Sequence, residues 1–169
     1  MSKKIREAIW EYCEQQIGIT EFPANSNIVK FNEHYYEKGH RYFLSPKDYP
    51  WCGTFCWEAY LQGGFEIPKE YKIHYVPTTY YKAKINKFTT KEPQLGDLII
   101  FEFASDSDNE IDHIGIFGEW IVKNHSFTTI EGNTSSSDKG SQSNGGGVFK
   151  KRREMKDVLA FVNLIDNIK

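Results

Sequence analysis

Four residues carry side chains that together could perform nucleophilic chemistry: Cys52, His113, Glu131 and Asn133. Cys52 stands at the start of a predicted helix, where free backbone amides and the helix dipole stabilise a thiolate. The same amides can hold the oxyanion that forms during acyl transfer. A cysteine before a helix is as often a structural thiol, so its role depends on which side chains the fold brings to it.

A predicted hairpin brings the other three residues together. If HIGIFGEW and SFTTIEGN pair around the IVKNH turn, His113 lies opposite Glu131. Glu131 and Asn133 are two residues apart, so both side chains share the face of His113. The imidazole could then accept the proton of the Cys52 thiol, and a carboxylate or carboxamide could hold its second nitrogen. We expect Glu131 to orient the ring and Asn133 to lie further along, near the mouth of the site.

The remaining cysteines and histidines are less suited to chemistry. Cys13, on the apolar stripe of a helix, and Cys56, one turn after Cys52, are expected to be buried core side chains. Three cysteines without a C-x-x-C element predict reduced thiols, with neither a disulfide framework nor a zinc ribbon. The histidines that lack a neighbouring ligand at metal spacing are His34, His40, His74 and His125.

One acidic cluster has side chains that could bind a cation. It follows the pattern D-x-D-x-E-x-D, with the members Asp106, Asp108, Glu110 and Asp112. The cluster lacks the glycine turn and the terminal bidentate glutamate of an EF-hand loop. A solvated loop is therefore favoured over a weak calcium site, and we expect no metal and no cofactor.

Helices in the first half and strands in the second must position these residues. The apolar pattern predicts helices over residues 3–16 and 51–61, separated by an irregular aromatic stretch over 20–50. A short helix is expected near 78–84. From residue 95 the pattern changes to runs of strand formers joined by short turns, which predicts three or four antiparallel strands. This segregation of helices from strands is typical of an α+β fold.

Length and composition limit the classes of protein. The 169 residues predict one domain, spanning residues 1–169. With 21 Lys and Arg against 23 Asp and Glu, the chain lacks the charge of a nucleic-acid binder. The basic run at 150–153 is attributed to a solvated strand edge rather than to a substrate patch. No signal peptide and no membrane-spanning segment are expected.

Four segments, taken in order, resemble a known family. PWCGTFCWEAY, GDLIIFEF, DHIGIF and TIEGNT look like the CHAP (cysteine, histidine-dependent amidohydrolase/peptidase) domain of bacteriophage endolysins and bacterial cell-wall hydrolases. The resemblance covers about residues 5–165. By the family pattern Cys52 would be the nucleophile and His113 the general base and acid. Glu131 and Asn133 would be the orienting and polar groups. The calcium-binding, Asp-rich loop that some members carry before the nucleophile is not seen in KGHRYFLSPKDYPWC.

The resemblance implies a papain-like α+β fold and a thiol peptidoglycan hydrolase of the endolysin type. Such an enzyme would be a cysteine endopeptidase or an N-acetylmuramoyl-L-alanine amidase, acting as a monomer on bacterial peptidoglycan. We expect synthesis in the host cytoplasm and action on the wall after release through a holin or by injection. The alternatives are a catalytically inactive CHAP-like wall-binding module, an injected interbacterial amidase toxin and a papain-like protease of folded proteins.

Overall fold

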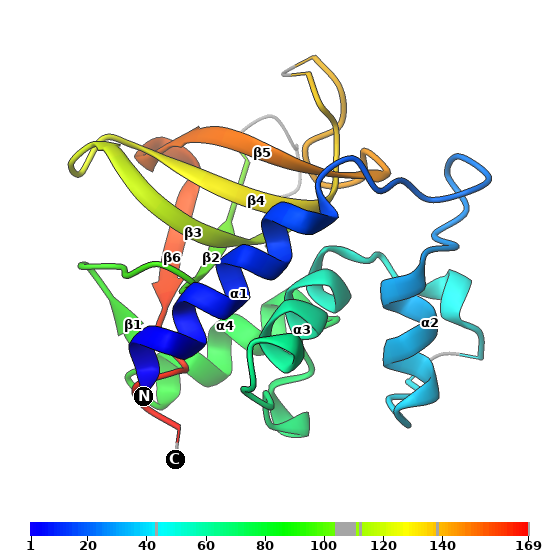
Figure 1. Ribbon diagram of the computed structural model, residues 1–169, viewed down its shortest axis with the longest axis horizontal. Coiled ribbons are helices and arrows are strands. Elements are labelled where there is room, and N and C mark those ends of the chain that lie inside the picture. The colour runs from blue at the N-terminus through cyan, green and yellow to red at the C-terminus, as the bar shows by residue number, and fades with distance from the viewer. Residues whose placement is uncertain (43, 104–110, 112, 138, 169) are drawn as a thin grey trace.

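The computed structural model describes the chain except for residues 43, 104–110, 112, 138 and 169 (Figure 1). The members of the acidic cluster, Asp106, Asp108, Glu110 and Asp112, all lie outside the described residues. Within the described part, no helix is long and apolar enough to span a bilayer.

Four helices and a six-stranded sheet make up the fold. The helices are α1 (Ser2–Gln16), α2 (Lys30–Glu37), α3 (Cys52–Gln62) and α4 (Val76–Ile85). The strands are β1 (Thr89–Thr90), β2 (Leu98–Phe101), β3 (His113–Val122), β4 (Ser126–Thr134), β5 (Gly147–Glu154) and β6 (Val158–Val162). All pairings are antiparallel, and the strand order is β1-β6-β2-β3-β4-β5. The α+β class is confirmed, as an arrangement consistent with a papain-like CHAP fold, but three or four strands were too few.

The helix that begins at Cys52 is the centre of the core. Nine of the eleven residues of α3 are buried, since the helix is apolar almost all round. It packs against β3 and β4 on one side and against α1 and α2 on others, as Figure 1 shows. The start of α3 is therefore fixed relative to the sheet by packing on several sides.

Both faces of the sheet carry apolar side chains. On the face toward α3, the buried residues include Ile100, Ile114, Ile116 and Ile130. The opposite face holds a smaller, aromatic cluster, made up of Ile99, Phe101, Phe103, Phe117, Phe127 and Phe161. His113 pairs with Phe101 and lies beside this aromatic cluster, with its ring 5.8 Å from that of Phe101.

The basic run lies on β5, at the edge of the sheet. The attribution to a solvated edge is wrong for half of it. Lys150 and Arg152 are exposed, whereas Lys151 and Arg153 are buried. The reason is the alternation of a strand, which turns every second side chain toward the covered face.

Candidate active site

Cys52 is the first residue of α3 and is 3% exposed. The first helical hydrogen bond runs from the N–H of Phe55 to the carbonyl oxygen of Trp51, at 3.0 Å. The backbone N–H groups of Cys52 and its next two neighbours precede that bond and have no acceptor in the helix ladder. The thiol thus lies where backbone donors and the helix dipole favour negative charge.

A buried carboxylate holds the residue before the nucleophile. Glu21, 7% exposed, accepts a hydrogen bond of 3.0 Å from the indole nitrogen of Trp51. Its other contacts are to the backbone N–H groups of Asn25 and Asn27. Glu21 therefore fastens the segment before α2 to the start of α3. Glu21 could not be identified from the sequence, because its partner Trp51 lies 30 residues further along the chain.

His113 is the first residue of β3 and is fully buried. Its Nε2 lies 2.9 Å from Oε2 of Glu131. Among the residues that the structure describes, its Nδ1 has no partner of normal hydrogen-bond geometry. Burial alone would lower the pKa of His113. Hydrogen bonding and charge from Cys52 and Glu131 outweigh burial and raise that pKa to about 9. Nδ1 is thus the ring nitrogen left for the thiol of Cys52.

Glu131 lies on β4 and is fully buried. Thr129 donates its hydroxyl to Oε1. Arg153 donates Nε to Oε1, at 2.8 Å, and Nη2 to Oε2. Burial would raise the pKa of Glu131, but the hydrogen bonds from Arg153 and His113 lower it to about 2. The carboxylate is therefore ionised and held between two cationic groups.

The expected register of the hairpin is wrong by two residues. Ile116 pairs with Ile130, and extending that register by one residue places Glu131 opposite Gly115 rather than opposite His113. The turn occupies residues 123–125, and the pairing shifts at irregularities beyond Phe117. A two-residue slip keeps every side chain on its face, so the expected juxtaposition survives.

Gly115 allows Glu131 to reach His113 diagonally. A Cβ at position 115 would lie 2.7 Å from Cγ of Glu131 and 3.4 Å from a ring carbon of Phe101. Such a contact would force the carboxylate to move. The missing side chain leaves the space that the Glu131 side chain occupies on its way to the imidazole.

Asn133 binds the loop that follows β4. Its backbone is left-handed, with φ of 57°, and its side chain is fully buried. Nδ2 donates to Oδ1 of Asn144 at 3.2 Å, and Oδ1 accepts from the N–H of Gly146 at 3.2 Å. These contacts fasten the glycine-rich loop after β4. In the described part of the chain Asn133 makes no hydrogen bond to His113.

The other two thiols are core side chains, and two of the other imidazoles have partners of their own. Cys13 and Cys56 are fully buried, and burial raises the pKa of both. His34 pairs with Glu58, and Nδ1 of His74 lies 2.9 Å from the hydroxyl of Tyr35. Within the described residues, no group of three His, Cys, Asp or Glu side chains could hold a metal ion.

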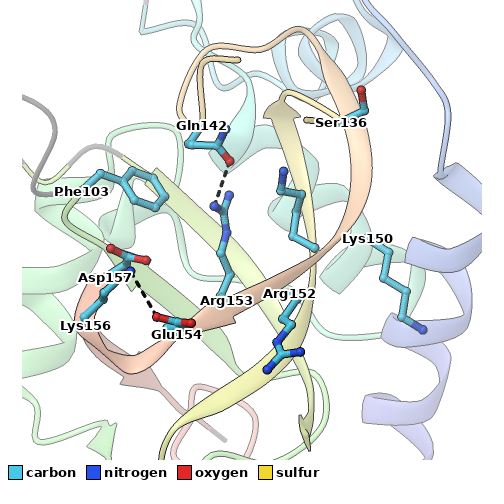
Figure 2. Close-up of a pocket in the computed structure, with 10 residues that line it drawn as sticks. Phe103, Ser136, Gln142, Lys150, Arg152, Arg153, Glu154, Lys156 and Asp157 are labelled. Carbon is cyan, nitrogen blue, oxygen red and sulfur yellow. Dashed lines mark hydrogen bonds and ion pairs between the residues drawn. The ribbon is translucent and has the colours of Figure 1, made fainter. Parts of the chain in front are cut away.

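A cleft of about 630 Å³ is lined mainly by residues of β5 and of the turn that follows it (Figure 2). Five cationic side chains line it, against the two carboxylates of Glu154 and Asp157. Figure 2 shows Arg153 pointing between Phe103 and the loop that carries Gln142, whose Oε1 accepts from Nη1 at 2.9 Å. Arg153 was also missed from the sequence, because its partner is identified only once the β4–β5 pairing is known.

Comparison with known proteins gives one result. A family model described as CHAP domain matches residues 44–133, which include α3, β2, β3 and nearly all of β4. No curated protein and no solved structure matches. Cys52, His113, Glu131 and Asn133 all fall within the matched segment, whereas Arg153 lies outside it.

Proposed function

Because this chain belongs to the CHAP domain family, whose members are typically cysteine- and histidine-dependent amidohydrolases or peptidases, we propose that it is an endolysin-type peptidoglycan hydrolase. It would cleave an amide bond of the bacterial wall, as an endopeptidase or as an N-acetylmuramoyl-L-alanine amidase. The observation that carries the proposal is the hydrogen bond between His113 and Glu131, which leaves Nδ1 for the thiol of Cys52.

In the first step, Sγ of Cys52 attacks the carbonyl carbon of the scissile amide. The thiol proton moves to Nδ1 of His113, and the charge that develops on the carbonyl oxygen is stabilised by N–H groups at the start of α3. When the C–N bond breaks, the imidazolium protonates the leaving amine. The acyl group remains on Cys52 as a thioester.

In the second step, water hydrolyses the thioester. His113 takes a proton from the attacking water at Nδ1 and returns it to the sulfur as the thiolate leaves. The product is a free carboxyl group. Glu131 holds Nε2 throughout, which fixes the ring and stabilises the imidazolium. Asn133, near the end of β4 and hydrogen-bonded to the loop that follows, would act indirectly by shaping the edge of the site.

The test is the release of fragments from purified peptidoglycans of several chemotypes, analysed by mass spectrometry. New amino termini within the stem peptide or cross-bridge identify an endopeptidase, and free lactyl groups on the sugar identify an amidase. Binding to walls without any fragment would instead support the inactive module. Cleavage of folded proteins but not of walls would support a general papain-like protease.

The raised pKa of His113 predicts an alkaline limit to activity. The thiolate–imidazolium pair exists while the imidazole is protonated, so activity should fall as pH rises through about 9. The pair contributes stability that is fully present below the ordinary histidine value of 6.5 and is lost as pH rises toward 9. The measurement is kcat/KM against pH on a soluble wall fragment. A descending limb near 6.5 would contradict the pairing.

Metal removal is expected to leave activity unchanged. The proposed reaction uses a thiol, an imidazole and backbone N–H groups, none of which needs a cation. The measurement is the fragment-release rate after treatment with a chelator and with added calcium. Complete loss of activity that calcium restores would overturn this expectation and direct attention to Asp106, Asp108, Glu110 and Asp112.

A further inference from the structure

We infer that Arg153, which lies outside the segment matched to the family, is a positioning residue that holds Glu131 against His113. The inference rests on the proposed function, because it concerns the same nucleophile and base. Arg153 would touch neither the substrate nor the thiol and would act through the carboxylate.

The contacts form a closed arrangement around one carboxylate. The guanidinium binds Glu131 as a fork, with Nε on Oε1 and Nη2 on Oε2. The hydroxyl of Thr129 donates a second hydrogen bond to Oε1, and Nε2 of His113 donates a second one to Oε2. Each oxygen therefore has two donors, and rotation of the carboxylate would break at least two hydrogen bonds. A planar fork imposes this geometry, whereas the ammonium of a lysine would not.

Two aromatic rings also pack against the guanidinium of Arg153. Arg153 is 7% exposed, and its Cζ lies 5.4 Å from the ring centroid of Phe101 and 5.0 Å from that of Phe103. The same two rings flank the imidazole of His113, at 5.8 and 6.0 Å. Arg153 and His113 are thus held by one aromatic pair, with Glu131 bound to both.

The charges at this point explain why an arginine is needed. Among the described residues, the titratable groups that interact with Glu131 are His113 on β3, Arg153 on β5 and Cys56 on α3. Cys52 interacts with His113. A fully buried carboxylate is costly without a cationic partner. When Cys52 is protonated and His113 neutral, Arg153 is the cation that keeps Glu131 ionised. Without Arg153, the carboxylate of Glu131 would bind a proton and would no longer stabilise the imidazolium of His113.

The chain offers a matched control on the same strand. Arg152 precedes Arg153, is exposed, and contacts only Oγ of Ser126, at 3.5 Å, among the hydrogen bonds of the described residues. Arg152→Met removes the same charge from β5 and leaves Glu131 untouched. Arg153→Lys keeps the charge but removes the fork, and Arg153→Met removes both.

The first readout needs no wall substrate: the rate of Cys52 alkylation by iodoacetamide against pH, located by mass spectrometry. For Arg153→Met we expect the midpoint of that profile to move upward by about one pH unit, because a weaker imidazolium supports less thiolate. We expect kcat on wall fragments to fall about 10- to 100-fold, as for other residues that orient a reacting group through a neighbour. The kcat of Arg153→Lys should lie between those of Arg153→Met and the wild type. The kcat of Arg152→Met should be within twofold of the wild type.

The double variant Glu131→Gln/Arg153→Met tests whether Arg153 acts through the carboxylate. Its rate should equal that of Glu131→Gln alone. Equal losses in Arg153→Met and Arg152→Met, or an unchanged alkylation profile, would overturn the inference. Thermal unfolding checks each fold, and if Arg153→Met does not fold, the profile of Arg153→Lys decides. A shifted profile in a protein that releases no wall fragments would support the positioning role and refute the proposed substrate.

Discussion

Replacement of Cys52 by alanine is expected to abolish the release of fragments from purified walls. The proposed reaction forms a covalent thioester, and no other described thiol is next to the imidazole of His113. Loss of the nucleophile should reduce the rate to the background of the assay. Thermal unfolding of the variant should remain close to the wild type, since the side chain is small. Wall hydrolysis that survived in Cys52→Ala would refute the mechanism.

The two other cysteines provide the matched controls. Cys13→Ala and Cys56→Ala remove side chains that are fully buried. They should mainly lower the free energy of unfolding, by at most a few kcal/mol, and leave kcat in the folded fraction unchanged. If Cys56→Ala abolished activity without changing the melting temperature, the nucleophile would have to be reassigned to that position, one turn further along α3.

The second large effect is expected for Glu131→Gln. Glutamine keeps the shape of the side chain, but its amide group presents N–H donors where Arg153 and His113 also donate. The variant leaves a buried guanidinium without its counter-ion and removes the charge that stabilises the imidazolium. We expect kcat to fall by about 10²- to 10⁴-fold, the range for losing the orienting carboxylate of a triad. The measurement is single-turnover hydrolysis of a wall fragment.

Asn133→Ala is the comparison for that variant. It removes the contacts to Asn144 and Gly146 that fasten the loop, and leaves the pair of His113 and Glu131 in place. Its loss of kcat should therefore be much smaller than that of Glu131→Gln. If Asn133→Ala instead lost most of its kcat and Glu131→Gln stayed near the wild type, Asn133 would be the residue that acts with Cys52 and His113.

The sequence was sufficient for the helix that carries Cys52 and for the shared face of His113 and Glu131, but not for the number of strands. The helix at Cys52 was predictable because it is apolar almost all round and follows a proline. Alternation along β3 and β4 placed His113 and Glu131 on one face, and the structure joins them by a hydrogen bond. Successive side chains of a strand alternate between the two faces of the sheet. A shift of the turn that moves the pairing by two residues therefore leaves each side chain on the same face.

The register and the partners of Glu131 could not be predicted in the same way. The pairing of β3 with β4 shifts between Phe117 and Val122, and such irregularities leave no clear trace in the residue types. Arg153 lies 22 residues from Glu131 along the chain, across a glycine-rich loop. Its contact depends on the β4–β5 pairing, which aligns Phe127 with Arg153. β1 has only two residues, too few to show a period.

The place of β6 in the sheet has a consequence for synthesis on the ribosome. β6 follows every other strand in the chain, yet it lies between β1 and β2. Both neighbours leave the ribosome long before it and must wait for a partner that is distant in sequence, which slows closure of the sheet. β5, which carries Arg153, also emerges late. The nascent chain should therefore acquire a reactive thiol at Cys52 only after residue 162 has left the ribosome.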